Sequence, residues 1–187
     1  MYMVINLKKY DFHDCIKEKL LRRIPPSKEK SEESINTAKK WLEEAEKGFE
    51  NEAFNSSVMA SYLAIFHSTR AMLFFDGFRE KSHYCVARYL EEKYAKKGLL
   101  ENKWIELLDH YRELRHNDQY STSFFATKEE SESAIEKAKE FVERMEKLLK
   151  TAEKGCCPKC GSTKIEAEDK TKLICKDCGL IWKKKQE

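Results

Sequence analysis

Proline and glycine are scarce over most of this 187-residue chain, and that scarcity limits the folds open to it. Between Pro26 and Pro158 there is no proline, and there are only four glycines. These residue types are the strongest local breaks in regular structure, so their scarcity predicts a few long elements. A many-stranded sandwich or barrel would need a turn about every 8–12 residues. The predicted fold is therefore all-α, with Gly48, Gly77 and Gly98 each marking the end of a helix.

Hydrophobic periodicity predicts a short N-terminal helix followed by five principal helices. The first should run from Phe12 to Arg23 and stop before Pro25 and Pro26. The others are expected at about residues 27–49, 52–75, 84–96, 99–115 and 127–149. The segment 52–75 is apolar around most of its circumference, so it should be the central, most buried helix. Short connections between these helices predict an antiparallel bundle.

Capping residues support several of these helix starts. Ser27 or Ser31 is the expected N-cap of the first long helix, and Ser82 is the expected cap of the helix over 84–96. Thr127 and Glu130 have the spacing of a capping box.

Charge is unevenly distributed along the chain. Residues 1–30 carry a balance of +4, residues 31–153 carry −5, and residues 154–187 carry +4. Basic ends of this kind attract phosphates, although solvated surface explains the same pattern. The apolar start is too short for a secretory signal, and polar residues interrupt the apolar run over 58–75. We therefore expect a cytoplasmic protein that does not associate with membranes.

The strongest chemical signal is a pair of C-x2-C knuckles. Cys157 and Cys160 form the first, and Cys175 and Cys178 form the second. Two residues between cysteines allow both thiolates to bind one tetrahedral ion, so we expect one structural Zn²⁺ with these four ligands. Cys156 is an alternative to Cys157 that breaks the spacing, and an oxidised dithiol pair is the alternative to metal.

These knuckles define a second unit. Residues 1–153 should form the helical bundle, with residues 1–26 as an N-terminal helix and break, and residues 154–187 should form a small β zinc ribbon. A ribbon of about thirty residues depends on its metal for most of its folding energy. Its lysines and Trp182 would suit nucleic acid, with the tryptophan stacking on a base. Equally, Trp182 completes the small core and the lysines keep the ribbon soluble.

Three stretches of the helical part together resemble one family. They are Ala60 to Leu73, Lys81 to Tyr84, and Glu113 to Tyr120 followed by Ala138 to Phe141. Their order and spacing are similar to the HEPN domain, in particular to its bacterial and archaeal branch known as UPF0332. The resemblance covers about residues 11–150 and implies an all-α bundle, usually dimeric. Many members are toxins or defence ribonucleases, often encoded beside a small nucleotidyltransferase.

The resemblance also implies candidate catalytic residues. Catalytic HEPN proteins use R-x4–6-H in a cleft at the dimer interface, where the arginine stabilises phosphate charge and the histidine transfers protons. With Arg115 as the motif arginine, Tyr120 stands at the histidine position, as it tends to do in UPF0332 proteins. That departure argues against nuclease activity. A shifted pair would use His116 with Arg115, or with Arg112 one helical turn earlier.

Polar residues on and near the central helix have two interpretations. A buried arginine or histidine needs a partner, so His67 and Arg70 are explained by a polar network that holds the bundle or dimer. The functional interpretation is a pocket for a nucleotide or RNA phosphate, formed by His67, Arg70, His83, Arg115 and Tyr120. Cys15 and Cys85 are expected to be small core residues rather than nucleophiles.

These observations favour an RNA- or nucleotide-binding HEPN module with a structural zinc ribbon. It would act as a homodimer and as the partner of a nucleotidyltransferase in a toxin–antitoxin or defence system. The alternatives are a metal-independent endoribonuclease and a protein–protein interaction adaptor.

The zinc assignment is testable by elemental analysis of the purified protein. We expect about one zinc per chain, lost when the four knuckle cysteines are replaced by serine, because thiolates are the ligands. The single change Cys156→Ser should leave the zinc in place, as this residue lies outside the C-x2-C spacing. Zinc content unaltered by the four replacements would show that the assignment is wrong.

Overall fold

The N-terminal region differs from the predicted single helix. The computed structural model describes residues 10–120, 125–153, 162, 164–169 and 171–183, with the backbone alone at 116–120, 182 and 183. Helix α1 spans only Phe12–Lys17, and strand β1, Leu21–Arg23, follows it. Lys19 has a φ of 57°, which ends the helix and turns the chain. Strand β1 pairs antiparallel with β2, Phe78–Glu80, and Arg22 lies opposite Arg79.

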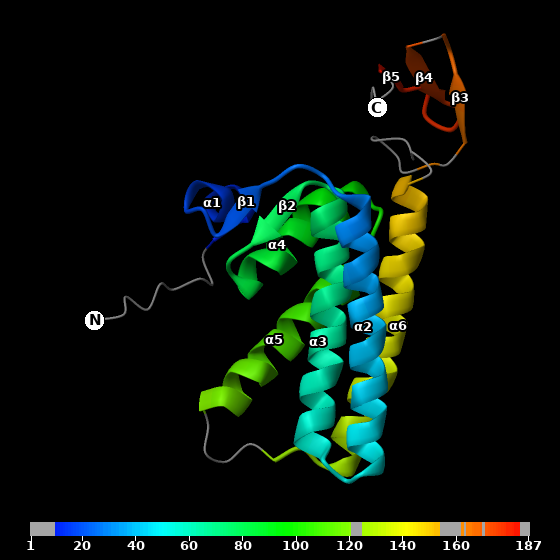
Figure 1. Ribbon diagram of the computed structural model, residues 1–187. Helices are drawn as coiled ribbons and strands as arrows, with labels where there is room; N and C mark the ends of the chain where they lie inside the picture. The colour runs from blue at the N-terminus through cyan, green and yellow to red at the C-terminus, as the bar shows by residue number, and fades with distance from the viewer. Residues whose placement is uncertain (1–9, 121–124, 154–161, 163, 170, 184–187) are drawn as a thin grey trace.

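Three long helices form the centre of the molecule, as Figure 1 shows. They are α2 at Lys28–Glu50, α3 at Phe54–Phe75 and α6 at Lys128–Glu153. Ser27 caps α2, with its Oγ accepting a hydrogen bond from the Lys30 amide, and the predicted capping box of α6 is present. Gly48 lies inside α2 rather than at its predicted end. A Cβ at Gly48 would lie 3.3 Å from the Ser57 amide nitrogen of α3. The predicted helical bundle is confirmed.

Serine hydroxyls join α2 to α3. Ser31 donates to the Ala71 carbonyl, Ser34 to the His67 carbonyl, and Ser57 to the Ala45 carbonyl, each at 2.8 Å. These side chains are small enough to let the two helices approach closely, and each buried hydroxyl has a partner. The α2–α3 pair is therefore fixed in position along its length.

Two further helices pack against α3. Helix α4 spans His83–Lys93 and continues into a 3-10 turn, η2, at Ala95–Lys97, before α5 at Asn102–Tyr120. Figure 1 shows α5 inclined to the three long helices. Helix α5 continues to Tyr120, beyond the predicted end at about residue 115. Asp76 accepts hydrogen bonds from the hydroxyls of Tyr89 and Tyr94, which holds α4 and its end against the end of α3.

The described part of the C-terminal segment is a three-stranded antiparallel sheet. Its strands are β3 at Ile165–Ala167, β4 at Lys172–Cys175 and β5 at Ile181–Lys183, in the order β3-β4-β5. The predicted strands are present. Whether the sheet is a zinc ribbon stays a prediction, because Cys157 and Cys160 lie outside the described residues.

Cys15 and Cys85 are both fully buried, as expected of core residues, and they form a disulfide. It joins α1 to α4 across 70 residues of sequence. No cysteine spacing predicts this pair, because the connection depends on how α1 folds back onto α4. The disulfide fixes the N-terminal segment that carries β1.

Helix α3 is long and apolar enough to cross a membrane by length and composition alone. However, 67% of its most apolar stretch is buried inside the structure. A helix at the centre of a bundle meets the same criterion, since it is apolar on every side.

The turn between α3 and β2 gives a prediction for stability. Gly77 has a φ of 75°, and a Cβ there would lie 2.7 Å from the Ile24 carbonyl oxygen. Gly77→Ala should lower the free energy of unfolding by about 3 kcal/mol, because it adds a clash to a left-handed backbone. Urea unfolding measures the loss.

Gly98→Ala is the matched control for that change. Gly98 also has a positive φ, 69°, but a Cβ there meets nothing within 4 Å. Gly98→Ala should lower the free energy of unfolding by only about 1 kcal/mol, because it adds backbone strain without a clash. Equal losses at the two glycines would contradict the proposed clash.

Candidate functional site

The start of α4 places His83 against the middle of α3. Its Nδ1 lies 2.5 Å from the Tyr62 hydroxyl, and its ring stacks on Phe66 with centroids 4.1 Å apart. In the tautomer that carries its proton on Nε2, His83 accepts from the Tyr62 hydroxyl through Nδ1. The Tyr62 hydroxyl and the Phe66 ring thus fix the orientation of the imidazole.

Burial keeps both members of this pair uncharged. Burial, and then the positive charges of Arg115 and Arg70, lower the pKa of His83 to about 4. Burial likewise raises the pKa of Tyr62 to about 12. At pH 7 the histidine is therefore a neutral base held beside positive charges.

Arg115 and Arg112 lie on α5 and differ in how they are held. Arg112 contacts the carboxylates of Asp109 and Glu113 and lies over the ring of Tyr84. Arg115 lies over Tyr62, with its guanidinium carbon 6.0 Å from the ring centroid. Among the described residues it has no carboxylate within ion-pair distance. Arg112 thus has a structural role, because carboxylates neutralise its charge. The charge of Arg115 is not neutralised by a carboxylate of the described residues.

His67 and Arg70 line a separate pocket on the neighbouring side of α3. Arg70 Nε is 2.9 Å from Glu80 Oε1 of β2, and its guanidinium lies over Phe74. Burial, and then the charge of Arg70, lower the pKa of His67. Both interpretations offered by the sequence therefore apply to Arg70, which has a structural partner and also faces a cavity.

The structure thus divides the predicted ligand pocket into two parts. His83 and Arg115 meet at Tyr62, whereas His67 and Arg70 line the pocket beside the start of α2. The side chains of His116 and Tyr120 lie outside the described residues. The sequence analysis missed Tyr62, because an aromatic residue in an apolar helix is expected to be core.

The second knuckle is described and has the local form that a metal site requires. Cys175 is fully buried at the end of β4, and Cys178 is half-buried in the turn that follows. Gly179 has a φ of 71°, and its amide donates to the Cys175 carbonyl at 2.8 Å. A glycine accepts this positive φ without the steric cost that a Cβ would add. Within the described residues no group of three metal-binding side chains occurs, and the first knuckle lies outside them.

The packing of the other helices around α3 defines an all-α helical bundle as the class of fold. The family model of the HEPN domain matches residues 31–148, and the chain belongs to the HEPN family. It is 33% identical over 116 residues to a Methanocaldococcus jannaschii protein named "Putative toxin MJ0605", covering 62% of this chain and 86% of that protein. A second protein of that organism, "Putative toxin MJ0142", is 25% identical over 122 residues, covering 65% and 83%.

The environment of His83 predicts that mild acid destabilises the protein. The unfolded chain protonates this histidine near pH 6.5, whereas the folded protein keeps it neutral until the pH approaches 4. The unfolded state therefore binds more protons between these values, so the free energy of unfolding falls as the pH falls. Since His83 is partly exposed, we expect a loss of about 1 kcal/mol between pH 7.5 and pH 5, measured by urea unfolding.

His83→Gln should reduce this pH dependence while keeping a hydrogen-bonding group near Tyr62. His110→Gln, at an exposed position of α5, is the control and should leave it unchanged. Some dependence should remain in the first variant, because the pKa of His67 is also lowered. An identical pH dependence in wild type and His83→Gln would contradict the assignment.

Proposed function

We propose that this HEPN protein binds RNA where α5 crosses the start of α4. The observation that carries the proposal is Arg115, which has no ion-pair partner among the described residues and lies beside the neutral, oriented His83. A phosphate placed there would gain a charge-assisted hydrogen bond from the guanidinium. The negative charge of the phosphate would also stabilise the protonated form of His83. Both Arg115 and His83 would therefore favour a bound anion.

The biological setting is proposed from the relatives. Two similar proteins carry the name toxin, which supports a toxin-like function for this chain. We place it in the UPF0332 branch, as a homodimer paired with a nucleotidyltransferase in a toxin–antitoxin or defence system, in the cytoplasm. A structural zinc held by Cys157, Cys160, Cys175 and Cys178 completes the proposal, and the Gly179 turn supports it.

A second candidate is metal-independent RNA cleavage, and one observation favours it. Tyr120 occupies the motif position of histidine, but the fold brings His83 of α4 close to Arg115. A neutral imidazole accepts the proton of a ribose 2′-hydroxyl as that oxygen attacks the adjacent phosphorus. Arg115 would stabilise the negative charge that develops as the bond to the 5′-oxygen breaks.

RNA affinity tests the main proposal. We expect Arg115→Gln to weaken binding of a single-stranded RNA about tenfold, and to reduce the slope of log affinity against log salt by about one. Fluorescence anisotropy over a range of salt concentrations measures both quantities. Lys103→Gln removes one charge from the other end of α5 and should change neither.

The same variants separate the candidate functions. If wild type cleaves RNA in EDTA, and both Arg115→Gln and His83→Gln abolish the cleavage, the nuclease candidate holds. Absence of cleavage in wild type rejects it and leaves the binding module. RNA affinity that is undetectable, or unaffected by Arg115→Gln, would reject RNA binding at this site and favour the interaction adaptor.

A further inference from the structure

A carboxylate joins α4 to α5 where these two helices pack against each other. Asp109 of α5 accepts from Arg88 of α4 through Oδ2, and its Oδ1 lies 3.3 Å from Arg112 Nε. Both guanidinium groups also lie over the ring of Tyr84, with their central carbons 5.1 and 5.4 Å from its centroid. Tyr84 is buried and its hydroxyl donates to the Tyr10 carbonyl, so the ring is a fixed surface for both arginines. We call the side chains of Asp109, Arg88, Arg112 and Tyr84 the Asp109 clamp.

The attraction between these charges is only partly screened, and it acts between helices. The side chains of Arg88, Asp109 and Arg112 are 20%, 26% and 18% exposed, so water reaches a small part of each. Two other carboxylates, Glu91 and Glu113, each contact an arginine of their own helix. Those contacts do not join α4 to α5, whereas the ion pair of Asp109 with Arg88 does.

The Asp109 clamp lies beside both residues of the candidate site. On α4, His83 directly precedes Tyr84. On α5, Arg115 follows Arg112 by three residues, so the two side chains lie on the same side of the helix. A change in how α5 meets α4 at the clamp would therefore alter the distance between Arg115 and His83.

The end of α5 has little other support. The buried side chains of this helix are Trp104, Ile105, Leu108 and Tyr111. Of the described side chains after Tyr111, Arg112, Leu114 and Arg115 are half-buried, and none is buried. Figure 1 shows the last turns of α5 pointing away from the three long helices. The position of Arg115 therefore depends more on the contacts of α5 with α4 than on the core.

We propose that Asp109 is a positioning residue, whose ion pairs at the α4–α5 contact place Arg115 beside His83. The carboxylate acts through the clamp, since its ion pairs are with Arg88 and Arg112. It also neutralises these two cations, which leaves Arg115 to supply positive charge to a ligand. The consequence for RNA rests on the function proposed above, whereas the placement of Arg115 can be measured without RNA.

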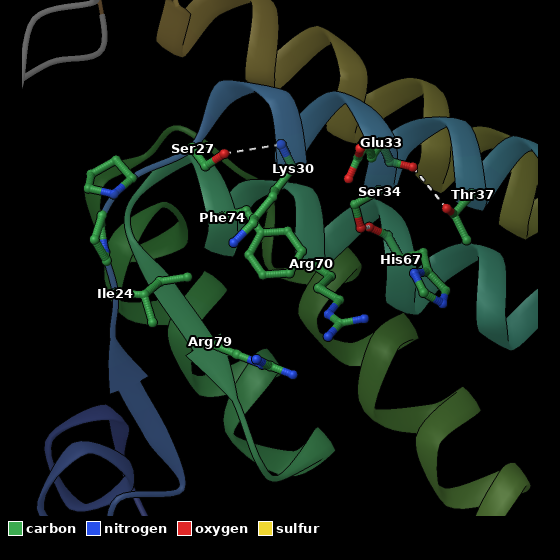
Figure 2. A pocket seen from close by; sticks show the side chains of 12 residues that line it. Ile24, Ser27, Lys30, Glu33, Ser34, Thr37, His67, Arg70, Phe74 and Arg79 are labelled. Carbon is green, nitrogen blue, oxygen red and sulfur yellow. Dashed lines mark hydrogen bonds between the residues drawn. The ribbon is translucent and has the colours of Figure 1, made fainter.

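The pKa of His83 depends on the position of Arg115. After burial, the charge of Arg115 has the largest effect on this pKa, and smaller effects come from Arg70, His67 and Arg112. Arg70 is held by other contacts, because it pairs with Glu80 of β2. Figure 2 shows Arg70 extending, with Arg79, into the pocket beside the start of α2. A displacement of α5 would therefore change the effect of Arg115 and leave that of Arg70 in place.

Asp109→Asn tests the placement, because the two possible effects on His83 have opposite signs. If Asp109 only supplies negative charge, its loss leaves two arginines uncompensated and lowers the pKa of His83 further. If Asp109 positions Arg115, the strongest positive neighbour moves away, and the pKa of His83 rises from about 4 toward its ordinary value of 6.5. We expect the rise, measured by NMR titration of the His83 imidazole in the full-length protein without RNA.

Three further variants control for charge and for folding. Glu106→Gln removes one negative charge from an exposed position of α5 and should leave the pKa of His83 unchanged. Asp109→Glu keeps the carboxylate and should preserve the low pKa, because a longer acidic side chain still bridges the two arginines. If Asp109→Asn fails to fold, Arg88→Gln breaks the same link from α4 and should also raise the pKa of His83.

RNA affinity tests the consequence for the proposed function. By fluorescence anisotropy, Asp109→Asn should weaken binding of a single-stranded RNA about fivefold, even though it releases two positive charges. A pKa of His83 that is unchanged or lowered in Asp109→Asn overturns the proposal. So does an RNA affinity that Arg115→Gln weakens and Asp109→Asn does not. A raised pKa in a protein that binds no RNA supports the positioning role and rejects only the RNA binding.

Discussion

Burial of most of the surface of α3 is the constraint on which the rest of the structure depends. Helices α2 and α6 cover it along its length, and α4 and α5 cover part of its remaining surface. A helix in this position can carry small and apolar residues throughout, but each polar side chain on it needs either a partner or a route to solvent. The hydroxyls of Ser57 and Ser68 donate to carbonyls. Tyr62 bonds to His83, and Arg70 bonds to Glu80 at the edge of a cavity. The polar residues that α3 carries at its edge are therefore where the candidate sites lie.

The sequence predicts the long helices because their signals are local. The apolar stripes of α2 and α6, the Thr127 capping box and the near-continuous hydrophobicity of α3 each depend on neighbouring residues only. The features that the sequence did not predict depend on contacts between residues that are distant in the chain. Strand β1 is three residues long and exists because β2 pairs with it, and Gly48 is retained inside α2 because Ser57 of α3 comes so close. A local break signal cannot distinguish a helix end from a close helix–helix contact.

For the candidate sites, too, the sequence predicts the residues but not the distant contacts that group them. His67, Arg70, His83 and Arg115 stand out in the sequence as charged or titratable residues near an apolar helix. Their division into two groups was not predictable, because it follows from the face of α3 that carries His67 and Arg70 and from how α4 and α5 pack. Arg79 could not be assigned without β2, since its position in the cavity depends on the β1–β2 pair. The turn of the second knuckle depends on five consecutive residues and is therefore a local feature, whereas its zinc stays a prediction.

The arginines of this protein fall into two groups according to their partners, and the difference assigns their roles. Arg70, Arg88 and Arg112 each contact a carboxylate, and each also lies over an aromatic ring. Such pairs hold helices and strands in register and contribute little net potential, since their charges cancel locally. Arg115 and Arg79 have no such partner among the described residues, so their fields extend into the space in front of them. The paired arginines therefore hold the elements around α3 in position, and the unpaired ones would supply the positive charge that a bound anion requires.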